Sequence, residues 1–115
     1  MPLPHLAKWT EAQRLVFVPG QLPYDASRQV VGAEIGAQTA QALANLDAVL
    51  RDAGLDRSRV VKATVWLRAA GDFTGFDAAY AAFFGEHRPA RSTVVCELVA
   101  PRALVEIEAV AARPA

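Results

Sequence analysis

The sequence predicts an α+β fold in which a mixed β-sheet carries two helices on one face. Two segments, residues 34–53 and 72–84, place apolar residues at helical spacing. Short segments rich in β-branched residues lie before, between and after them. The resulting order is β-β-α-β-α-β-β. Crossovers between parallel strands are right-handed in about 98% of cases, and this favours both helices on the same face.

The first predicted strand is a short apolar run, residues 15–18, which ends at Pro19 and Gly20. A Pro-Gly pair is a strong turn signal. Residues 21–28 combine proline, aspartate and serine and are predicted to form a loop. Residues 29–31 are then predicted as a short returning strand.

The first helix is predicted over residues 34–53. Its apolar side chains recur every three or four positions, and Gly54 follows as the glycine that commonly ends a helix. The polar side chains of this segment are expected on a solvated face: Gln38, Gln41, Asn45 and Arg51.

Residues 59–68 are predicted as a strand because β-branched side chains alternate along them. One face is expected to carry Val61, Ala63, Val65 and Leu67, and the other Val60, Lys62, Thr64 and Trp66. Asp72 is then a candidate N-cap for the second helix, residues 72–84. Five aromatic residues of this helix share one stripe, which is expected to face the core. Pro89 prevents its continuation.

The last two predicted strands are residues 92–98 and 104–111. In the second, Val105 and Ile107 are expected to point to one face, and Glu106 and Glu108 to the other. Two helices can cover only one face of this sheet, yet several strands carry apolar residues on both faces. Large apolar patches are rare on soluble monomers, so we expect a homo-oligomer in which the open face meets other subunits.

The composition limits the function. The chain has 115 residues, which predicts a single domain spanning residues 1–115. Hydrophobic residues make up 53% and charged residues 21%, which excludes an intrinsically disordered chain. Twelve basic residues balance twelve acidic ones, and this zero net charge argues against a surface dedicated to nucleic acid or anionic membranes. No segment approaches the roughly 20 apolar residues of a membrane span. No secretory signal is recognised, so a cytoplasmic location is expected.

The sequence contains few residues for metal or nucleophilic chemistry. Cys96 is the only cysteine, so no intrachain disulfide can form. It lies within a predicted strand and is expected to be a small buried hydrophobic side chain rather than a nucleophile. His5 and His87 lie in predicted loops and do not make a recognisable zinc site with one cysteine, so no metal is expected.

Arg91 and Glu106 are the candidate functional residues. Arg91 directly precedes a predicted strand, and Glu106 lies in the last one. If the two strands are adjacent, both side chains project onto one edge of the open face. A guanidinium binds a carboxylate through two hydrogen bonds, and a partly buried carboxylate can position water or carry protons. The pair is a minimal site for a small carboxylic acid; the alternative is an Arg–Glu ion pair that closes an interface.

Six segments, in order, resemble those of the Rid family, the reactive intermediate deaminases, also called the YjgF family. They are residues 15–21 (LVFVPGQ), 38–46 (QTAQALANL), 60–65 (VVKATV), 72–84, 89–92 (PARS) and 105–111 (VEIEAVA). Each motif is weak by itself, but six in family order and spacing are specific. The match extends from about residue 15 to residue 112.

The resemblance implies a chorismate-mutase-like fold and a homotrimer with sites in the clefts between subunits. It also implies an activity without cofactor or metal. In this activity, enamines and imines such as 2-aminoacrylate are hydrolysed to 2-oxo acids and ammonia. The implied partners are a small-molecule imine or 2-oxo acid and further copies of the chain, with no nucleic acid and no membrane.

The resemblance also implies residue roles. Arg91 stands at the arginine that holds the substrate carboxylate, and Glu106 at the glutamate that positions the attacking water. The backbone at Thr93 is expected to bind substrate. The substrate pocket is further expected to include Pro19, Gly20 and Asp77.

Four positions depart from the family pattern. Leu6 aligns with a tyrosine, Pro19 with a serine, Asp77 with an asparagine and Thr93 with a cysteine. The lost tyrosine and serine remove polar contacts from one wall of the pocket, which bears on substrate and rate more than on reaction class. Asp77 could also compete as an anion for Arg91.

Two other functions remain open beside the deaminase. One is a non-catalytic protein that binds small carboxylates or acts as a regulator, which the lost tyrosine and serine suggest. The other is a ribonuclease, which zero net charge and the lack of a histidine pair for acid–base cleavage support poorly.

Overall fold

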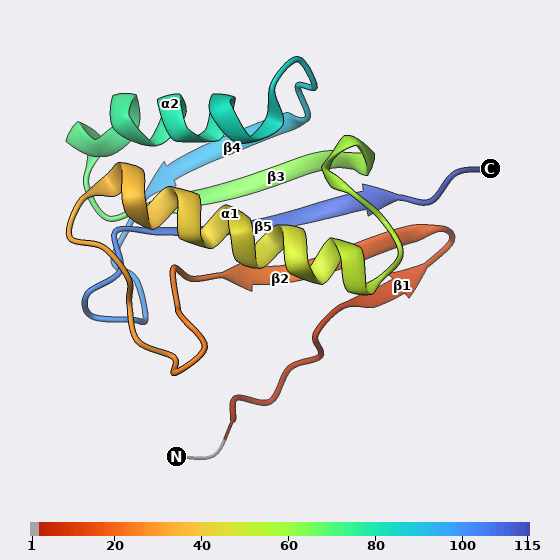
Figure 1. Ribbon diagram of the computed structural model, residues 1–115, viewed down its shortest axis with the longest axis horizontal. Helices are drawn as coiled ribbons and strands as arrows, with labels where there is room; N and C mark the ends of the chain where they lie inside the picture. Colours follow the sequence, from red (N-terminus) through yellow and green to blue (C-terminus); the bar gives the residue numbers. More distant parts are fainter. Residues whose placement is uncertain (1–2) are drawn as a thin grey trace.

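Five strands form one sheet, and both helices pack on the same face of it (Figure 1). The computed structural model describes residues 3–115. The strands are β1 (Thr10–Ala12), β2 (Leu15–Gln21), β3 (Val60–Leu67), β4 (Ala90–Val95) and β5 (Val105–Ala112). The helices are α1 (Ile35–Asp52) and α2 (Phe73–Phe84), with single 3-10 turns η1 (Arg57–Arg59) and η2 (Ala70–Asp72). This arrangement confirms the predicted α+β class and, apart from one of the two strands before α1, the order of its elements.

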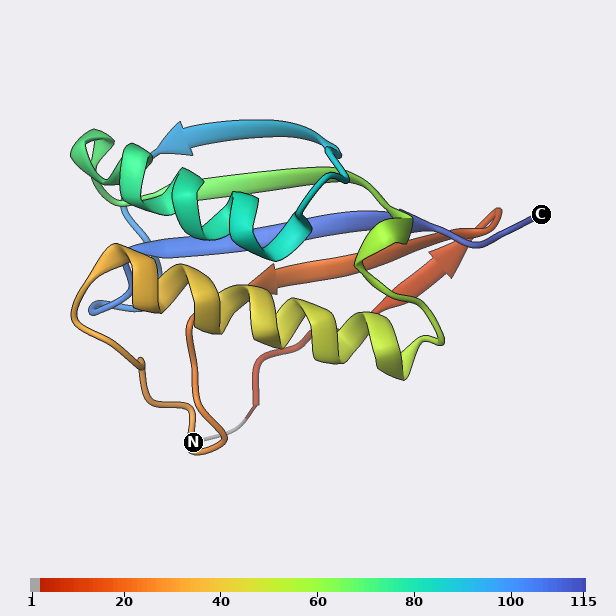
Figure 2. The same ribbon diagram turned by 45° about the horizontal axis from the view of Figure 1, so that its top comes forward.

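The strand order across the sheet is β1-β2-β5-β3-β4. Only β3 and β4 pair in parallel, and α2 makes the crossover between them; the other pairs are antiparallel. Figure 2 shows α2 over the β3–β4 side of the sheet and α1 over the β2–β5 side. The opposite face carries no helix in the part of the chain that the structure describes.

The core lies between the sheet and the two helices. Strand β5 alternates as predicted, with Val105, Ile107, Ala109 and Ala111 buried. Opposite them, α1 and α2 contribute fully buried side chains: Leu43, Leu46, Leu50 and Phe76. Burying one such side chain stabilises the fold by about 1.5–3 kcal/mol, so these rows hold the helices to the sheet.

The helix boundaries follow the predicted signals. Helix α1 ends before Gly54, whose φ of 81° is the left-handed conformation that glycine adopts without strain. Asp72 is at the N-cap position of α2, although its side chain makes no capping hydrogen bond. Gly85, with a φ of 64°, follows the last helical residue.

The prediction for the second N-terminal strand was wrong. Residues 29–31 form no strand; Val30 makes only an isolated bridge to Tyr24. The partner of β2 is instead β1, joined to it by a turn at Gln13 and Arg14, whose φ values are 50° and 66°. All three residues of β1 are exposed, so no hydrophobic alternation marks this edge strand in the sequence.

Two further predictions fail at strand ends. A register shift between Val60 and Lys62 leaves Val60 fully buried and Val61 47% exposed, the reverse of the predicted faces at those two positions. Strand β4 begins at Ala90 and ends at Val95, so Cys96 lies beyond it. Cys96 is exposed, because the chain leaves the sheet before reaching it.

Of the polar side chains predicted on a solvated face of α1, Arg51 is exposed as predicted, but Gln38 is buried, and Gln41 and Asn45 are half-buried. Gln38 is 2% exposed, and its amide donates to the carbonyls of Gly32 and Arg102 while accepting from the Leu104 N–H. Asn45 donates to the carbonyls of two loop residues, Leu22 and Tyr24. The loops before α1 and before β5 fold back onto the helix, and these amides satisfy their backbone groups.

Candidate functional site

Arg91 lies on the helix-covered side of the sheet. In β4 it is aligned with Ala63 of β3, which is fully buried between sheet and helices. Side chains at aligned positions share a face, so the guanidinium extends beneath α2. There its Nη1 atom lies 2.9 Å from Oδ1 of Asp77, and the Arg91 side chain is 21% exposed. Asp77 and Arg91 thus form an ion pair within one chain, as the sequence allowed.

Three aromatic rings of α2 surround the same guanidinium. The Arg91 Cζ atom lies 4.7 Å from the ring centroid of Tyr80, 5.1 Å from that of Phe76 and 5.5 Å from that of Phe73. Contacts within about 6 Å are favourable cation–π interactions. The aromatic stripe was predicted only as core; it also holds the arginine in one orientation. The available signal was that Phe73 and Tyr80 lie four residues before and three residues after Asp77, on the same side of the helix.

The Tyr80 hydroxyl is buried and has no hydrogen-bond partner within residues 3–115. Burial raises the pKa of Tyr80, the Arg91 charge opposes this rise, and the Asp77 charge adds to it. The phenol therefore stays neutral at physiological pH beside the guanidinium.

Glu106 lies on the open face. It is aligned with Trp66 of β3, and its neighbours along β5 at positions 105 and 107 are buried on the other side. Burial raises the pKa of Glu106, and the nearby charge of Glu108 raises it further. Within the described residues, its carboxylate makes no hydrogen bond or ion pair. The side chain is thus more readily protonated than an ordinary glutamate, which suits proton transfer.

Gly20 leaves the space that the Glu106 carboxylate occupies. A Cβ atom at position 20 would overlap that carboxylate. The pairing of β2 with β5 shifts register between Val18 and Gln21, so Pro19 and Gly20 form a bulge at this point. Proline lacks an N–H and is tolerated at such irregular positions. Pro19 and Gly20 therefore leave room in β2 for the side chain of Glu106.

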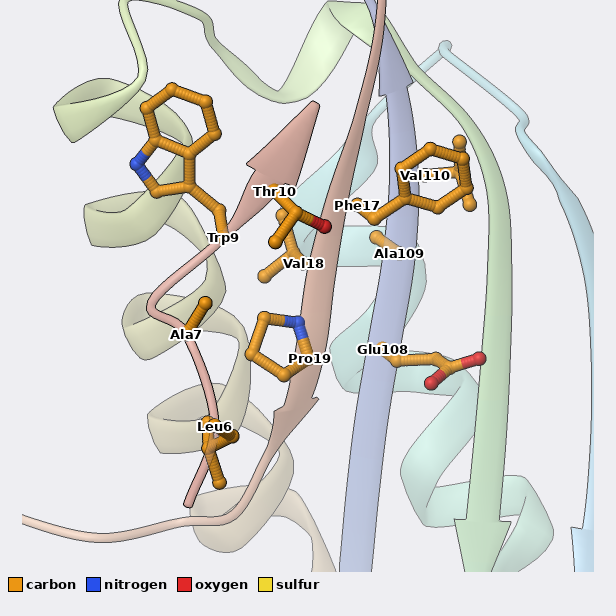
Figure 3. Close-up of a pocket in the computed structure, with 10 residues that line it drawn as sticks. All are labelled: Leu6, Ala7, Trp9, Thr10, Phe17, Val18, Pro19, Glu108, Ala109 and Val110. Carbon is orange, nitrogen blue, oxygen red and sulfur yellow. The ribbon is translucent and has the colours of Figure 1, made fainter. Parts of the chain in front are cut away.

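A groove of about 740 Å³ extends from Glu106 along the N-terminal segment. Its lining includes Leu6, Pro19, Gly20, Tyr24, Asn45 and Glu106. A smaller pocket of about 230 Å³ shares Leu6 and Pro19 and is shown in Figure 3, where Glu108 directs its carboxylate away from Leu6. Leu6, which the sequence resemblance implies to stand in place of a tyrosine, thus lies in the groove that contains Glu106.

The structure separates the predicted site residues into two groups. Arg91, Thr93 and Asp77 form the arginine half, on the helix-covered side; Thr93 is aligned with buried Val65 and so faces the same way as Arg91. Pro19, Gly20 and Glu106 form the glutamate half, on the other side. The condition for Arg91 and Glu106 to share one edge of the open face was that their strands are adjacent, and it is not met, because β3 lies between β4 and β5. Within one chain, Arg91 pairs with Asp77 and not with Glu106.

Two features bear on metals and membranes. Residues 3–115 contain no group of three or more His, Cys, Asp or Glu side chains placed to hold a metal ion. Over the same residues, neither helix has the length and hydropathy of a transmembrane segment.

A family model described as Endoribonuclease L-PSP matches residues 2–113. The chain belongs to this family, the Rid or YjgF family. A 2-iminobutanoate/2-iminopropanoate deaminase of Salmonella typhimurium is 38% identical over 102 residues, which cover 86% of this chain and 80% of that protein. A RutC family protein of Pyrococcus horikoshii is 36% identical over 111 residues, covering 96% of this chain and 88% of that protein.

Solved Rid structures have the same fold. The E. coli YjgF gene product superimposes with a TM-score of 0.87 at 34% identity, covering 95% of this chain and 88% of that chain. E. coli TdcF with bound serine gives a TM-score of 0.90 at 28% identity, covering 98% of this chain and 91% of that chain. The resemblance drawn from six sequence segments is confirmed.

Proposed function

We propose that this protein hydrolyses 2-imino acids, and the enamines that interconvert with them, to 2-oxo acids and ammonia. The observation that carries the proposal is the arginine half, a guanidinium fixed by Asp77 and three aromatic rings with donors left for a carboxylate. The name of the Salmonella typhimurium relative supports the same reaction class.

The proposed reaction needs water, Arg91 and Glu106. Arg91 binds the substrate carboxylate, assisted by the backbone at Thr93, and so fixes the position of the imine carbon. Glu106 holds a water molecule whose oxygen attacks that carbon, while the C=N electron pair moves to nitrogen. Glu106 carries the proton released by the water to the nitrogen. Glu106 then takes the proton of the new hydroxyl group and passes it to the nitrogen, so that the C–N bond breaks, ammonia leaves, and the carbon–oxygen double bond of the 2-oxo acid forms.

We propose further that two subunits build each site. A ligand that touches both Arg91 and Glu106 must lie between chains, because the two side chains are on opposite sides of the sheet. The open face offers apolar side chains for such an assembly, among them Phe17 at 41% and Val94 at 45% exposure. A homotrimer is the assembly that the family resemblance implies.

The activity test generates 2-aminoacrylate in place with a serine dehydratase and traps it with semicarbazide. The wild type should divert the flux to pyruvate, and Arg91→Ala should not. Arg88→Ala is the matched control, because Arg88 is an exposed arginine three residues away on the preceding loop. A panel of larger imines from an amino-acid oxidase belongs in the same experiment. Full activity of Arg91→Ala, or no activity of the wild type toward any imine of the panel, would contradict the proposal.

The shared site has its own test. Arg91→Ala and Glu106→Gln chains should each be inactive but should regain activity when they are co-expressed and purified as mixed oligomers. In a closed ring that joins Arg91 of one chain to Glu106 of the next, random mixing leaves about a quarter of the sites intact. Arg91→Ala mixed with the double variant is the control, because no chain then carries Arg91. If the mixture of Arg91→Ala and Glu106→Gln chains regains no activity, Arg91 and Glu106 of a working site belong to the same chain.

Non-catalytic binding of small carboxylates is the second candidate. It is favoured by Leu6 and Pro19, which replace two polar groups in the wall of the groove that contains Glu106. In that case a 2-oxo acid should raise the melting temperature in a saturable way without turnover of any imine. Absence of any thermal shift with a carboxylate panel would count against it.

A further inference from the structure

Asp77 places a negative charge beside the guanidinium that is proposed to bind substrate. Its Oδ1 atom accepts from Arg91 Nη1 at 2.9 Å, and its side chain is 49% exposed. Within residues 3–115, no hydrogen bond uses its second oxygen. A guanidinium has five N–H donors, so one contact with Asp77 leaves most of them free. The arginine half therefore presents both a donor group and a neighbouring acceptor of opposite charge.

This pairing changes what the arginine half can bind. A simple carboxylate on the free donors of Arg91 is attracted by the guanidinium but repelled by Asp77 a few ångströms away. A carboxylate with a protonated nitrogen on the adjacent carbon is attracted by both, because its N–H groups can donate to the free oxygen of Asp77. At about 4 Å, one such charge interaction changes affinity by about fivefold even when water screens it fully.

We propose that Asp77 makes the site selective for zwitterions, that is, for carboxylates with a protonated nitrogen on the adjacent carbon. This inference rests on the proposed function and names the form of the substrate: the 2-iminium acid rather than the neutral imine. Protonation of the imine nitrogen makes its carbon more electrophilic, so the form that Asp77 binds is also the form that water attacks most readily.

The same contact acts on the product. Hydrolysis replaces the N–H donors by a carbonyl oxygen, which can only accept hydrogen bonds. The 2-oxo acid then carries one net negative charge and turns an acceptor toward Asp77. Asp77 therefore weakens product binding and favours product release, while Arg91 still binds the incoming zwitterion.

Binding of matched ligands tests the inference. Alanine and lactate differ only in an ammonium or a hydroxyl group on the carbon next to the carboxylate, and pyruvate is the product-like 2-oxo acid. Calorimetric titration should show that Asp77→Asn binds lactate and pyruvate about fivefold more tightly than the wild type does, and alanine no more tightly. Glu86→Gln is the control, because it removes one exposed negative charge just after α2. Equal changes for all three ligands, or none, would overturn the proposal.

Turnover separates this inference from the proposed function. With 2-aminoacrylate as the source of imine, Asp77→Asn should show about fivefold stronger inhibition by lactate, which the reaction does not produce, and a lower kcat/KM. Turnover by the wild type with unchanged inhibition in the variant overturns the role of Asp77 alone. Altered ligand preference with no turnover in either protein overturns the deaminase alone. Failure of all three ligands to bind either protein, together with no turnover by the wild type, overturns both.

Discussion

The arginine half and the glutamate half differ in how their charges are compensated. The charge of Arg91 is met by Asp77 at 2.9 Å and by three aromatic rings. The charge of Glu106 meets no partner in the described residues, and burial together with Glu108 raises its pKa. A compensated charge holds one geometry and is suited to binding. An uncompensated carboxylate exchanges its proton readily and is suited to chemistry.

Removal of the arginine should have the largest effect. Arg91→Ala should lower kcat/KM for imine hydrolysis by about 100-fold or more, because a lost charged hydrogen-bond partner typically costs 2–5 kcal/mol. Arg91→Lys should recover only part of this loss, since an ammonium cannot make the planar two-bond contact. The coupled pyruvate assay measures both variants. Equal activity of the lysine variant and the wild type would show that charge alone suffices.

Glu106→Gln should lower kcat by roughly 100-fold or more, the usual range for a lost general acid–base group. Its effect on ligand affinity should be small, because binding is assigned to the other half. Steady-state kinetics and pyruvate titration separate the two quantities. A large loss of affinity with unchanged kcat in this variant would indicate that Glu106 binds the ligand and does not take part in proton transfer.

Gly20→Ala should act through Glu106. The added Cβ atom displaces only the end of a flexible side chain, so the free energy of unfolding should change by less than about 1 kcal/mol. Activity should nevertheless fall about tenfold, because the carboxylate leaves its position. In a Glu106→Gln background, Gly20→Ala should cause no further loss. An additive loss in the double variant would show that Gly20 acts independently of Glu106.

Leu6→Tyr tests the wall of the groove. Leu6 is 60% exposed, so the substitution should leave stability within about 0.5 kcal/mol. A hydroxyl near Glu106 should raise kcat/KM for small imines severalfold by adding a hydrogen bond to substrate or water. Leu6→Phe is the control for ring size. An equal gain from phenylalanine would assign the effect to packing.

The smallest effect is on stability and depends on pH. In the folded chain the pKa of Glu106 lies above its ordinary value of 4.5, so the folded state binds this proton more tightly than the unfolded state does. As the pH rises from 4.5 through the higher pKa of the folded state, ionisation of Glu106 therefore lowers the free energy of unfolding of the wild type. Glu106→Gln lacks this loss, and its advantage in chemical denaturation should grow from acidic to neutral pH. A constant difference across that range would contradict the assignment.

The sequence was sufficient for the elements whose side chains face the core. Helix α2 and strand β5 lie within one residue of their predicted bounds, because long periodic apolar patterns mark them. The sequence was insufficient for β1, because this strand is exposed and carries no apolar alternation. It was also insufficient for the side-chain amides of α1, because their hydrogen-bond partners are backbone groups of distant loops. Glu106 was assigned to the open face correctly. The side on which Arg91 lies depends on the pairing of β4 with β3, which no local pattern specifies.

The position of β3 between β4 and β5 has a consequence for gene evolution. If each site joins the arginine half of one chain to the glutamate half of another, one gene encodes both sides of every site. After a gene duplication, one copy could lose Arg91 and the other Glu106 while their mixed assembly kept working sites. Each copy would then depend on the other, so a site shared in this way permits an obligate pair of proteins to arise from a self-sufficient one.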